Sequence, residues 1–231
     1  MRRILILGAV AALMVIALGR LVLIPALGRA VMRTVEARGS ELMQTAVQVE
    51  STTLDLLHRR AILSNLRVAN PTGFRTDYAL AIERVVVTVD PTTLRSDLVV
   101  LKEVAIEAPT LVYEFGAADN NIAVLRRAIE TRVAAQDAGV VNGDNPEARL
   151  LVESLRVTHG KVRILSQFLG PQELTGRLSD IQLGAIGTTA GTSAARVVQE
   201  LLATMTKGVR SNLRQLDLRG GGGTGPSGLY P

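Results

Sequence analysis

The segment VLKEVAIEAP, residues Val100 to Pro109, carries the pattern that decides the predicted fold. It reads as two apolar residues, two polar residues, an apolar-x-apolar triplet and, after a short spacer, a turn former. The segments ILSNLRVANP (Ile62 to Pro71) and LVESLRVTHG (Leu151 to Gly160) align with it without gaps. Because such alternation is typical of β-strands, we expect one β unit used three times, each copy supplying an edge on which the next pairs. Chance similarity among short β-segments is the competing interpretation.

Turns and amphipathic helices surround these segments. Asn70-Pro71-Thr72-Gly73 and Asp90-Pro91-Thr92-Thr93 have the composition of tight turns. Apolar residues recur at helical spacing at about 121–135 and about 193–213. We therefore expect an α+β fold: a mainly antiparallel, curved or twisted β-sheet, built from repeats and shaped like a groove, with an amino-terminal transmembrane helix and two amphipathic helices.

One apolar face is predicted along the second and third copies of the β unit. Its candidate lipid-facing residues are Leu98, Val100, Val104, Ile106, Leu155 and Val157. If this face is open, a lipid tail can lie on it, since each buried methylene contributes about 0.8 kcal/mol. If the two predicted helices cover it, the same residues form a closed core. The sequence leaves both alternatives open.

Residues 1–28 are predicted to form a transmembrane signal-anchor. The run ILILGAVAALMVIALG, Ile4 to Gly19, carries no charge, and apolar sequence resumes after Arg20. A helix from Ile4 to Ile24 is about 31 Å long, which is enough to cross the hydrocarbon core of a bilayer. The chain is therefore expected to span a membrane once, which makes the membrane one of its partners.

Charged residues at the two ends of this run are predicted to lie at the membrane interface. Arg2 and Arg3 favour a cytoplasmic amino terminus, and the guanidinium of Arg20 reaches the headgroups at the outer end. The competing interpretation is a cleaved signal peptide, with Ala26-Leu27-Gly28 as the cleavage site. Both interpretations place the bulk of the chain outside the cytoplasm.

The rest of the chain divides into three predicted parts. Residues 29–45 form a helical connector, and residues 46–217 form a β-rich domain with a surface linker at about 136–148. Residues 218–231 are rich in glycine and are expected to be a disordered tail.

Few residues point to enzymatic chemistry. The chain has no cysteine, which excludes disulfides, thiolate metal sites and cysteine nucleophiles. Its two histidines, His58 and His159, fall in predicted turns without a second ligand at metal-binding spacing. The glycine-rich stretch from Gly220 lacks the Lys-Ser/Thr ending of a phosphate loop. We therefore expect a non-enzymatic protein with no catalytic residue, no metal and no cofactor.

The basic character of the chain does not indicate nucleic-acid binding. The net charge is +5, but the basic residues are scattered rather than clustered. With three Phe, three Tyr and no Trp, the chain also lacks aromatic platforms on which bases could stack. We expect no nucleic-acid partner.

Several short motifs follow the apolar start and a β pair in chain order: NPTGF (residues 70–74), VDPTTL (89–94), EAPTLVYE (107–114) and NNIAVL (120–125). Together they resemble the amino-terminal region of the AsmA-like family of membrane-anchored, periplasm-facing proteins. The resemblance covers roughly residues 1 to 185 and consists of turn and strand patterns. The family is related in architecture to the chorein-type bridge-like lipid-transfer proteins.

The resemblance implies a single-pass protein of the bacterial inner membrane, with a cytoplasmic amino terminus and the bulk of the chain in the periplasm. It also implies an apolar β groove that binds or handles phospholipid in cell-envelope maintenance. The alternative is an envelope scaffold or assembly factor with a closed core, which contacts envelope proteins or itself through a sheet edge. About eight strands span only about 40 Å of sheet, so one copy is not expected to bridge an envelope.

Overall fold

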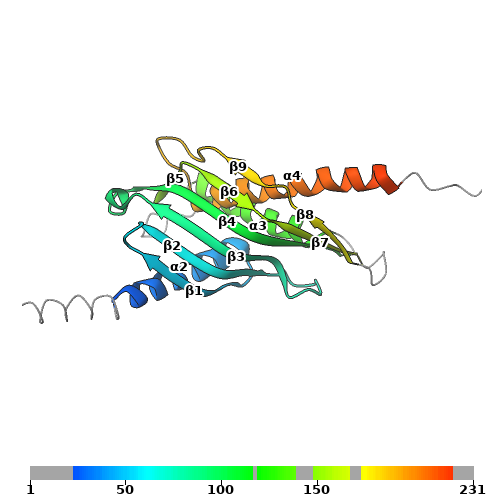
Figure 1. Cartoon of the computed structure of the whole chain (residues 1–231), viewed down its shortest axis with the longest axis horizontal. Coiled ribbons are helices and arrows are strands. Elements are labelled where there is room, and N and C mark those ends of the chain that lie inside the picture. The colour runs from blue at the N-terminus through cyan, green and yellow to red at the C-terminus, as the bar shows by residue number, and fades with distance from the viewer. Residues whose placement is uncertain (1–22, 117–118, 139–147, 167–172, 221–231) are drawn as a thin grey trace, which may run out of the picture.

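The computed structural model describes residues 23–116, 119–138, 148–166 and 173–220 (Figure 1). Outside these ranges lie Arg2, Arg3, Arg20, the run Ile4 to Gly19, and residues 221–231 of the predicted tail. Within them, no helix combines the length and the apolar composition that crossing a membrane requires.

The fold is α+β, with one open sheet of nine strands in the described residues. The first four strands form an antiparallel meander: β1 (Val47–Asp55), β2 (Arg60–Ala69), β3 (Tyr78–Val89) and β4 (Leu98–Phe115). The others are short: β5 (Arg149–Val152), β6 (Leu155–Thr158), β7 (Lys161–Ser166), β8 (Glu173–Arg177) and β9 (Ile181–Leu183). A single 3-10 turn, η2 (Pro91–Thr93), begins the connection from β3 to β4.

In the part of the chain that the structure describes, three helices accompany the sheet: α2 (Ile24–Met43), α3 (Asn121–Asp137) and α4 (Ala194–Gly220). α2 packs along β1, and α3 contacts both α2 and α4, so the three helices share one side of the sheet (Figure 1). α3 and α4 lie where the two amphipathic helices are predicted, although α4 continues beyond residue 213 to Gly220. α2 begins inside the predicted anchor, at Ile24, and continues through most of the predicted connector.

The sheet is mixed, which refines the predicted, mainly antiparallel arrangement. β4 pairs in parallel with β5, β6 and β7, while the remaining pairs are antiparallel. The reason is the connection: α3 follows β4 and carries the chain back to the end where β4 began, so the next strand runs in the same direction.

The second and third copies of the predicted repeat lie side by side in this parallel pairing. Val100 is opposite Leu151 and Val104 is opposite Leu155, which is the register of the gapless sequence alignment. The first copy lies two strands away in β2, where Ile62 pairs with Val86 of the intervening β3. Only the second and third copies therefore provide edges for each other.

A row of residues with left-handed backbone crosses the sheet. Asn65, Ala108 and His159 have φ angles of 50°, 50° and 58°, and the strand registers place them on one line. A left-handed residue interrupts the alternation of side chains, so even-numbered Ile106 and odd-numbered Leu111 both enter the core. Because of this row, side chains on both sides of it can enter one continuous core, although the alternation of inward and outward side chains shifts by one residue along each strand.

The core lies between the sheet and the helices. It joins strand residues to the apolar faces of α3 and α4; its most buried large side chains include Leu111, Ile122, Ile129, Leu155 and Met205. The helices thus cover the middle of the sheet, and this determines which apolar residues remain accessible.

Candidate functional site

Four of the six predicted lipid-facing residues lie in the core. Ile106, Leu155 and Val157 are 4%, 1% and 1% exposed, and Val104 packs against them while partly buried. The core cluster also contains residues of α3 and α4, so protein side chains cover this part of the apolar face. At these positions the structure has the arrangement of the closed-core alternative.

Leu98 and Val100 lie on the opposite face of β4. The register between β3 and β4 shifts between Thr88 and Val89, which leaves Lys102 as an extra residue in β4. Leu101 and Val104, on either side of this bulge, both pack against the core. Because neighbouring strand residues point to opposite faces, the face predicted to hold all four β4 residues is divided in two.

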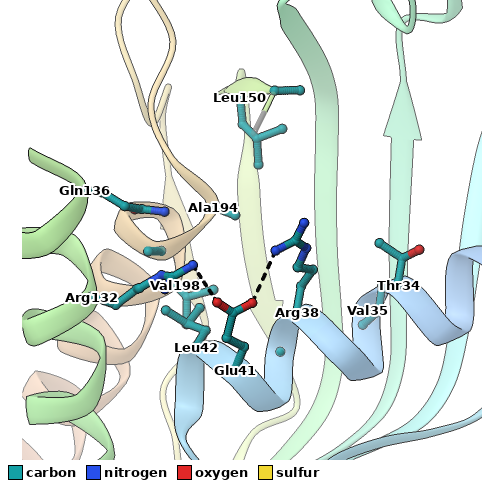
Figure 2. A pocket seen from close by; sticks show the side chains of 13 residues that line it. Thr34, Val35, Arg38, Glu41, Leu42, Arg132, Gln136, Leu150, Ala194 and Val198 are labelled. Carbon is teal, nitrogen blue, oxygen red and sulfur yellow. Dashed lines mark hydrogen bonds and ion pairs between the residues drawn. The ribbon is translucent and has the colours of Figure 1, made fainter. Parts of the chain in front are cut away.

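An open cavity of about 610 Å³ lies elsewhere, where α2, α3, the start of α4 and β5 meet (Figure 2). Its volume is within the roughly 300–1,000 Å³ typical of small-molecule sites. The lining residues are Thr34, Val35, Arg38, Gly39, Glu41, Leu42, Arg132, Gln136, Ala148, Leu150, Ala194, Ala195 and Val198. None of the six predicted lipid-facing residues is among them.

Helical spacing brings one side of α2 to this cavity. Val35, Gly39 and Leu42 are three or four residues apart and therefore share a face. At Gly39 an added Cβ would lie 3.1 Å from a methyl carbon of Val47, so the small residue lets α2 approach β1 closely. With Leu150 on the sheet and Val198 on α4, these residues make the walls of the cavity mainly apolar.

Charged side chains gather where α2 meets α3. The carboxylate of Glu41 contacts Arg38 at 3.2 Å and Arg132 at 2.7 Å, and Figure 2 shows the two arginines on either side of it. Two guanidinium groups and one carboxylate therefore lie together at this edge of the cavity. The cavity thus combines apolar walls with a guanidinium edge, formed by Arg38 and Arg132, and guanidinium groups pair well with anionic oxygens.

The carboxylate and the hydroxyl group of the cavity lining have partners within the protein. The carboxylate, that of Glu41, is engaged by two arginines, and the hydroxyl of Thr34 donates to the Ala30 carbonyl at 3.0 Å. No group of three or more His, Asp or Glu residues in the described ranges is placed to hold a metal ion.

A buried polar network lies near the carboxyl-terminal end of β4. Glu114 accepts hydrogen bonds from the N–H groups of Arg75 and Thr76 at 2.6 and 2.9 Å. Burial raises the pKa of this carboxyl, but the N–H groups of Thr76 and Arg75 lower it more, so the pKa lies below its ordinary value. An ionised acceptor that holds a loop in this way has a structural role.

The asparagine pair at the start of α3 has two different roles. Asn120 accepts from the Ala123 N–H at 2.9 Å and so caps the helix. Asn121 is completely buried; it donates to the Val112 carbonyl and accepts from the Glu114 N–H. An asparagine pair at a helix start is typical of capping. The role of Asn121 could be recognised only from the structure, because its partners lie on β4.

No protein-family model matches the chain, and no curated protein matches it either. The resemblance to the AsmA-like family therefore stays a prediction from the sequence motifs.

The cavity was missed at the sequence level, although part of its signal is present. Val35 and Leu42 fall on the apolar side of the predicted connector, and Val198 falls on that of the predicted last helix. Periodicity identifies such faces one helix at a time. It does not reveal that the faces of separate helices meet around an unfilled space.

Proposed function

We propose that this protein is a membrane-anchored, periplasm-facing, non-enzymatic module that binds lipid, with an acyl chain held in the cavity between α2, α3, α4 and β5. The observation that carries the proposal is the combination of apolar walls and a guanidinium edge in one open cavity. The proposal keeps the lipid ligand and the role in cell-envelope maintenance that are expected from the sequence. It places the lipid site on the helical side of the sheet instead of on the apolar strand face.

The chemistry of an acyl chain fits the walls. Each methylene removed from water contributes about 0.8 kcal/mol, and Val35, Leu42, Leu150 and Val198 offer apolar contacts. An anionic headgroup at the edge would compete with Glu41 for the guanidinium groups of α2 and α3. This competition predicts preference for an anionic over a neutral headgroup.

Photocrosslinking tests the acyl-chain site. The full chain, in nanodiscs containing a photoactivatable phospholipid, is expected to crosslink through residues 34–42 and 132–136. Ala194→Trp places an indole in the cavity and should lower this crosslinking several-fold; Ala134→Trp, on an exposed part of α3 outside the cavity, should not. Equal crosslinking in both variants, at unchanged melting temperatures, would overturn the proposal.

The guanidinium edge has its own test. Arg132→Gln should reduce the preference for phosphatidylglycerol over phosphatidylcholine among the crosslinked lipids. Arg126→Gln is the matched control, because Arg126 pairs with Glu130 on α3 and does not line the cavity. The same lipid preference in both variants would exclude a role for Arg132 in headgroup selection.

The scaffold alternative rests on a different observation. In the described residues, β8 pairs with β7 alone, and Leu174 at this edge of the sheet is exposed. An edge strand can pair with a strand of another chain, including a second copy. Absence of lipid crosslinks at the cavity, together with recovery of a protein crosslinked through β8, would favour this function.

A further inference from the structure

Exposed leucines are concentrated at one end of the molecule. Leu56 and Leu57, in the turn between β1 and β2, are 61% and 83% exposed, and Leu94, after η2, is 57% exposed. Leu23 and Leu27 are exposed at the start of α2. These five are the majority of the seven large apolar residues exposed in the described chain, so their common location needs an explanation.

The fold brings these segments together. The Val89 N–H donates to the Arg59 carbonyl at 3.0 Å, which joins the β1–β2 turn to the end of β3. α2 and β1 run in opposite directions, and an added Cβ at Gly28 would lie 2.8 Å from the Thr52 carbonyl oxygen. The start of α2 therefore lies beside the end of β1, and Figure 1 shows both turns and this helix start at the left end of the molecule.

The two turns are closed by polar groups, and their leucines take no part in closing them. Asp55 accepts from the His58 N–H at 3.0 Å, and Asp90 accepts from the Thr92 N–H at 3.0 Å. Turn residues with high exposure and no packing role are usually polar. Three leucines at exposed turns indicate contact with an apolar environment outside the chain.

Basic side chains accompany the leucines. Arg59 and Arg95 are exposed and follow Leu57 and Leu94 closely in the chain, and Arg29 and Arg33 are exposed on α2. Against them stands the exposed carboxylate of Asp97, while Asp55 and Asp90 are engaged within their turns. Leucines flanked by arginines have the composition of a surface that enters the headgroup region of an anionic bilayer.

The position of the apolar amino-terminal sequence agrees with this surface. The described chain begins at Leu23, at the same end as the two turns, and the uncharged run Ile4 to Gly19 precedes it in the sequence. A segment predicted to cross a membrane thus joins the folded body beside the exposed leucines.

We infer that the turns carrying Leu56, Leu57 and Leu94 insert into the interface of an anionic phospholipid bilayer, with Arg59 and Arg95 at the headgroups. The domain then contacts the membrane with the end that carries these turns. The inference goes beyond acyl-chain binding in the cavity and does not depend on it. It has one structural consequence for that cavity: Leu150, in its wall, pairs with Val99 near the start of β4, so the cavity lies toward the membrane end.

Depth-dependent fluorescence quenching tests the inference. Because the chain has no cysteine, Leu57→Cys or Leu94→Cys introduces a single labelling site in the full chain. A polarity-sensitive fluorophore at either position should be quenched several-fold more by brominated lipid than the same fluorophore at Leu174→Cys. Leu174 is the matched control, since it is an exposed leucine on β8, at the other end of the sheet (Figure 1).

The outcomes separate the possible occupants of this surface. The vesicles contain phosphatidylcholine and phosphatidylglycerol, and equal, solvent-like emission at positions 57 and 174 would overturn the inference. Blue-shifted emission at position 57 without lipid quenching would replace the membrane by a protein contact, and also overturn it. Undiminished quenching in Arg59→Glu/Arg95→Glu, or in phosphatidylcholine alone, would remove the role of the arginines.

Failure of this inference is distinguishable from failure of the cavity proposal. Ala194→Trp should lower lipid crosslinking in the cavity and leave quenching at position 57 unchanged. Leu56→Ser/Leu57→Ser, tested with the fluorophore at position 94, should lower quenching and leave the melting temperature unchanged, because both leucines are exposed.

Discussion

The strand connections at the two ends of the sheet are held to the body in different ways. The near end carries the β1–β2 and β3–β4 connections and the start of α2, and the far end carries the β2–β3 connection. At the far end, the loop between β2 and β3 is held by Glu114, which lies more than thirty-five residues away along the chain. At the near end, the carboxylates of Asp55 and Asp90 accept hydrogen bonds from residues two to five positions further along. The far end is tied by long-range contacts, whereas each near-end turn is closed largely by its own residues.

This difference separates residues that hold the fold from residues that are free for contact. A buried polar group at the far end has partners that would be left unsatisfied if it were removed. A leucine on a near-end turn has no such partners, and its exposure costs the folded state little. Variants at the far end should therefore change stability, and variants at the near end should change surface contacts.

The largest effect is expected for Asn121→Ala. The change leaves the Val112 carbonyl and the Glu114 N–H without their buried partner, so unfolding free energy should fall by roughly 2–4 kcal/mol. Asn120→Ala, which removes only the helix cap, should cost about 1 kcal/mol. Urea denaturation of both variants measures the difference. Equal losses of unfolding free energy would contradict the distinction between the buried Asn121 and the helix cap Asn120.

The next largest effect is expected for Glu114→Gln. An amide in place of the carboxylate keeps one acceptor oxygen and turns the other into an NH2 group, so the N–H of Arg75 or of Thr76 loses its acceptor, and stability should fall by about 1–3 kcal/mol. The loop should open locally, which hydrogen exchange at Thr76 would detect. Unchanged protection at Thr76 would show that the loop is held by other contacts.

The same carboxyl predicts how stability depends on pH. Its pKa is lowered in the folded protein from the ordinary 4.5, so its stabilising contribution is complete above that value. The contribution is lost as the pH falls below 4.5 toward the lower folded pKa. Glu114→Gln should lack this part of the acid destabilisation, as measured by denaturation midpoints across that range.

A smaller effect is expected for Asp90→Ala at the near end. Asp90 accepts from the Thr92 N–H and hydroxyl, and its loss should loosen one exposed turn without disturbing the core. The decrease in melting temperature should be smaller than for Glu114→Gln. A larger decrease would mean that the near end also supports the body.

The smallest effect on stability is expected for Leu57→Ser. The side chain is 83% exposed, so the free energy of unfolding should stay within about 0.5 kcal/mol of the wild type. The measurement is urea denaturation of the detergent-solubilised chain, in which no bilayer is present. A substantial loss would place Leu57 in a structural contact and remove the contrast between the two ends.

Much of the architecture could be predicted from local patterns. The strand and helix periodicities predict the α+β class, and the gapless alignment of Val100 to Pro109 with Leu151 to Gly160 has the register that the paired strands adopt. The parallel direction could not be read in this way, because the same apolar alternation suits a strand of either direction. It follows from the return path of α3 across the sheet.

The candidate site was less predictable than the fold. The alternation that placed Val100 and Val104 on one face ignores the bulge at Lys102, which moves them to opposite faces. Whether Ile106 or Leu155 meets lipid depends on the helices that cover them, and those helices are distant in sequence. The cavity depends on the same packing, since its walls come from segments more than a hundred residues apart.

By itself, the sequence determined the apolar start, the strand and helix segments, the turns and the register shared by two strand units, because each depends on residues close together in the chain. Tertiary structure alone decided the direction of β5 to β7, which apolar residues are covered, where a cavity remains, and that Leu57 and Leu94 share one end with the start of α2. The physical reason is that burial and proximity are properties of packed elements. An apolar side chain has the same local preference whether a helix covers it or leaves it exposed.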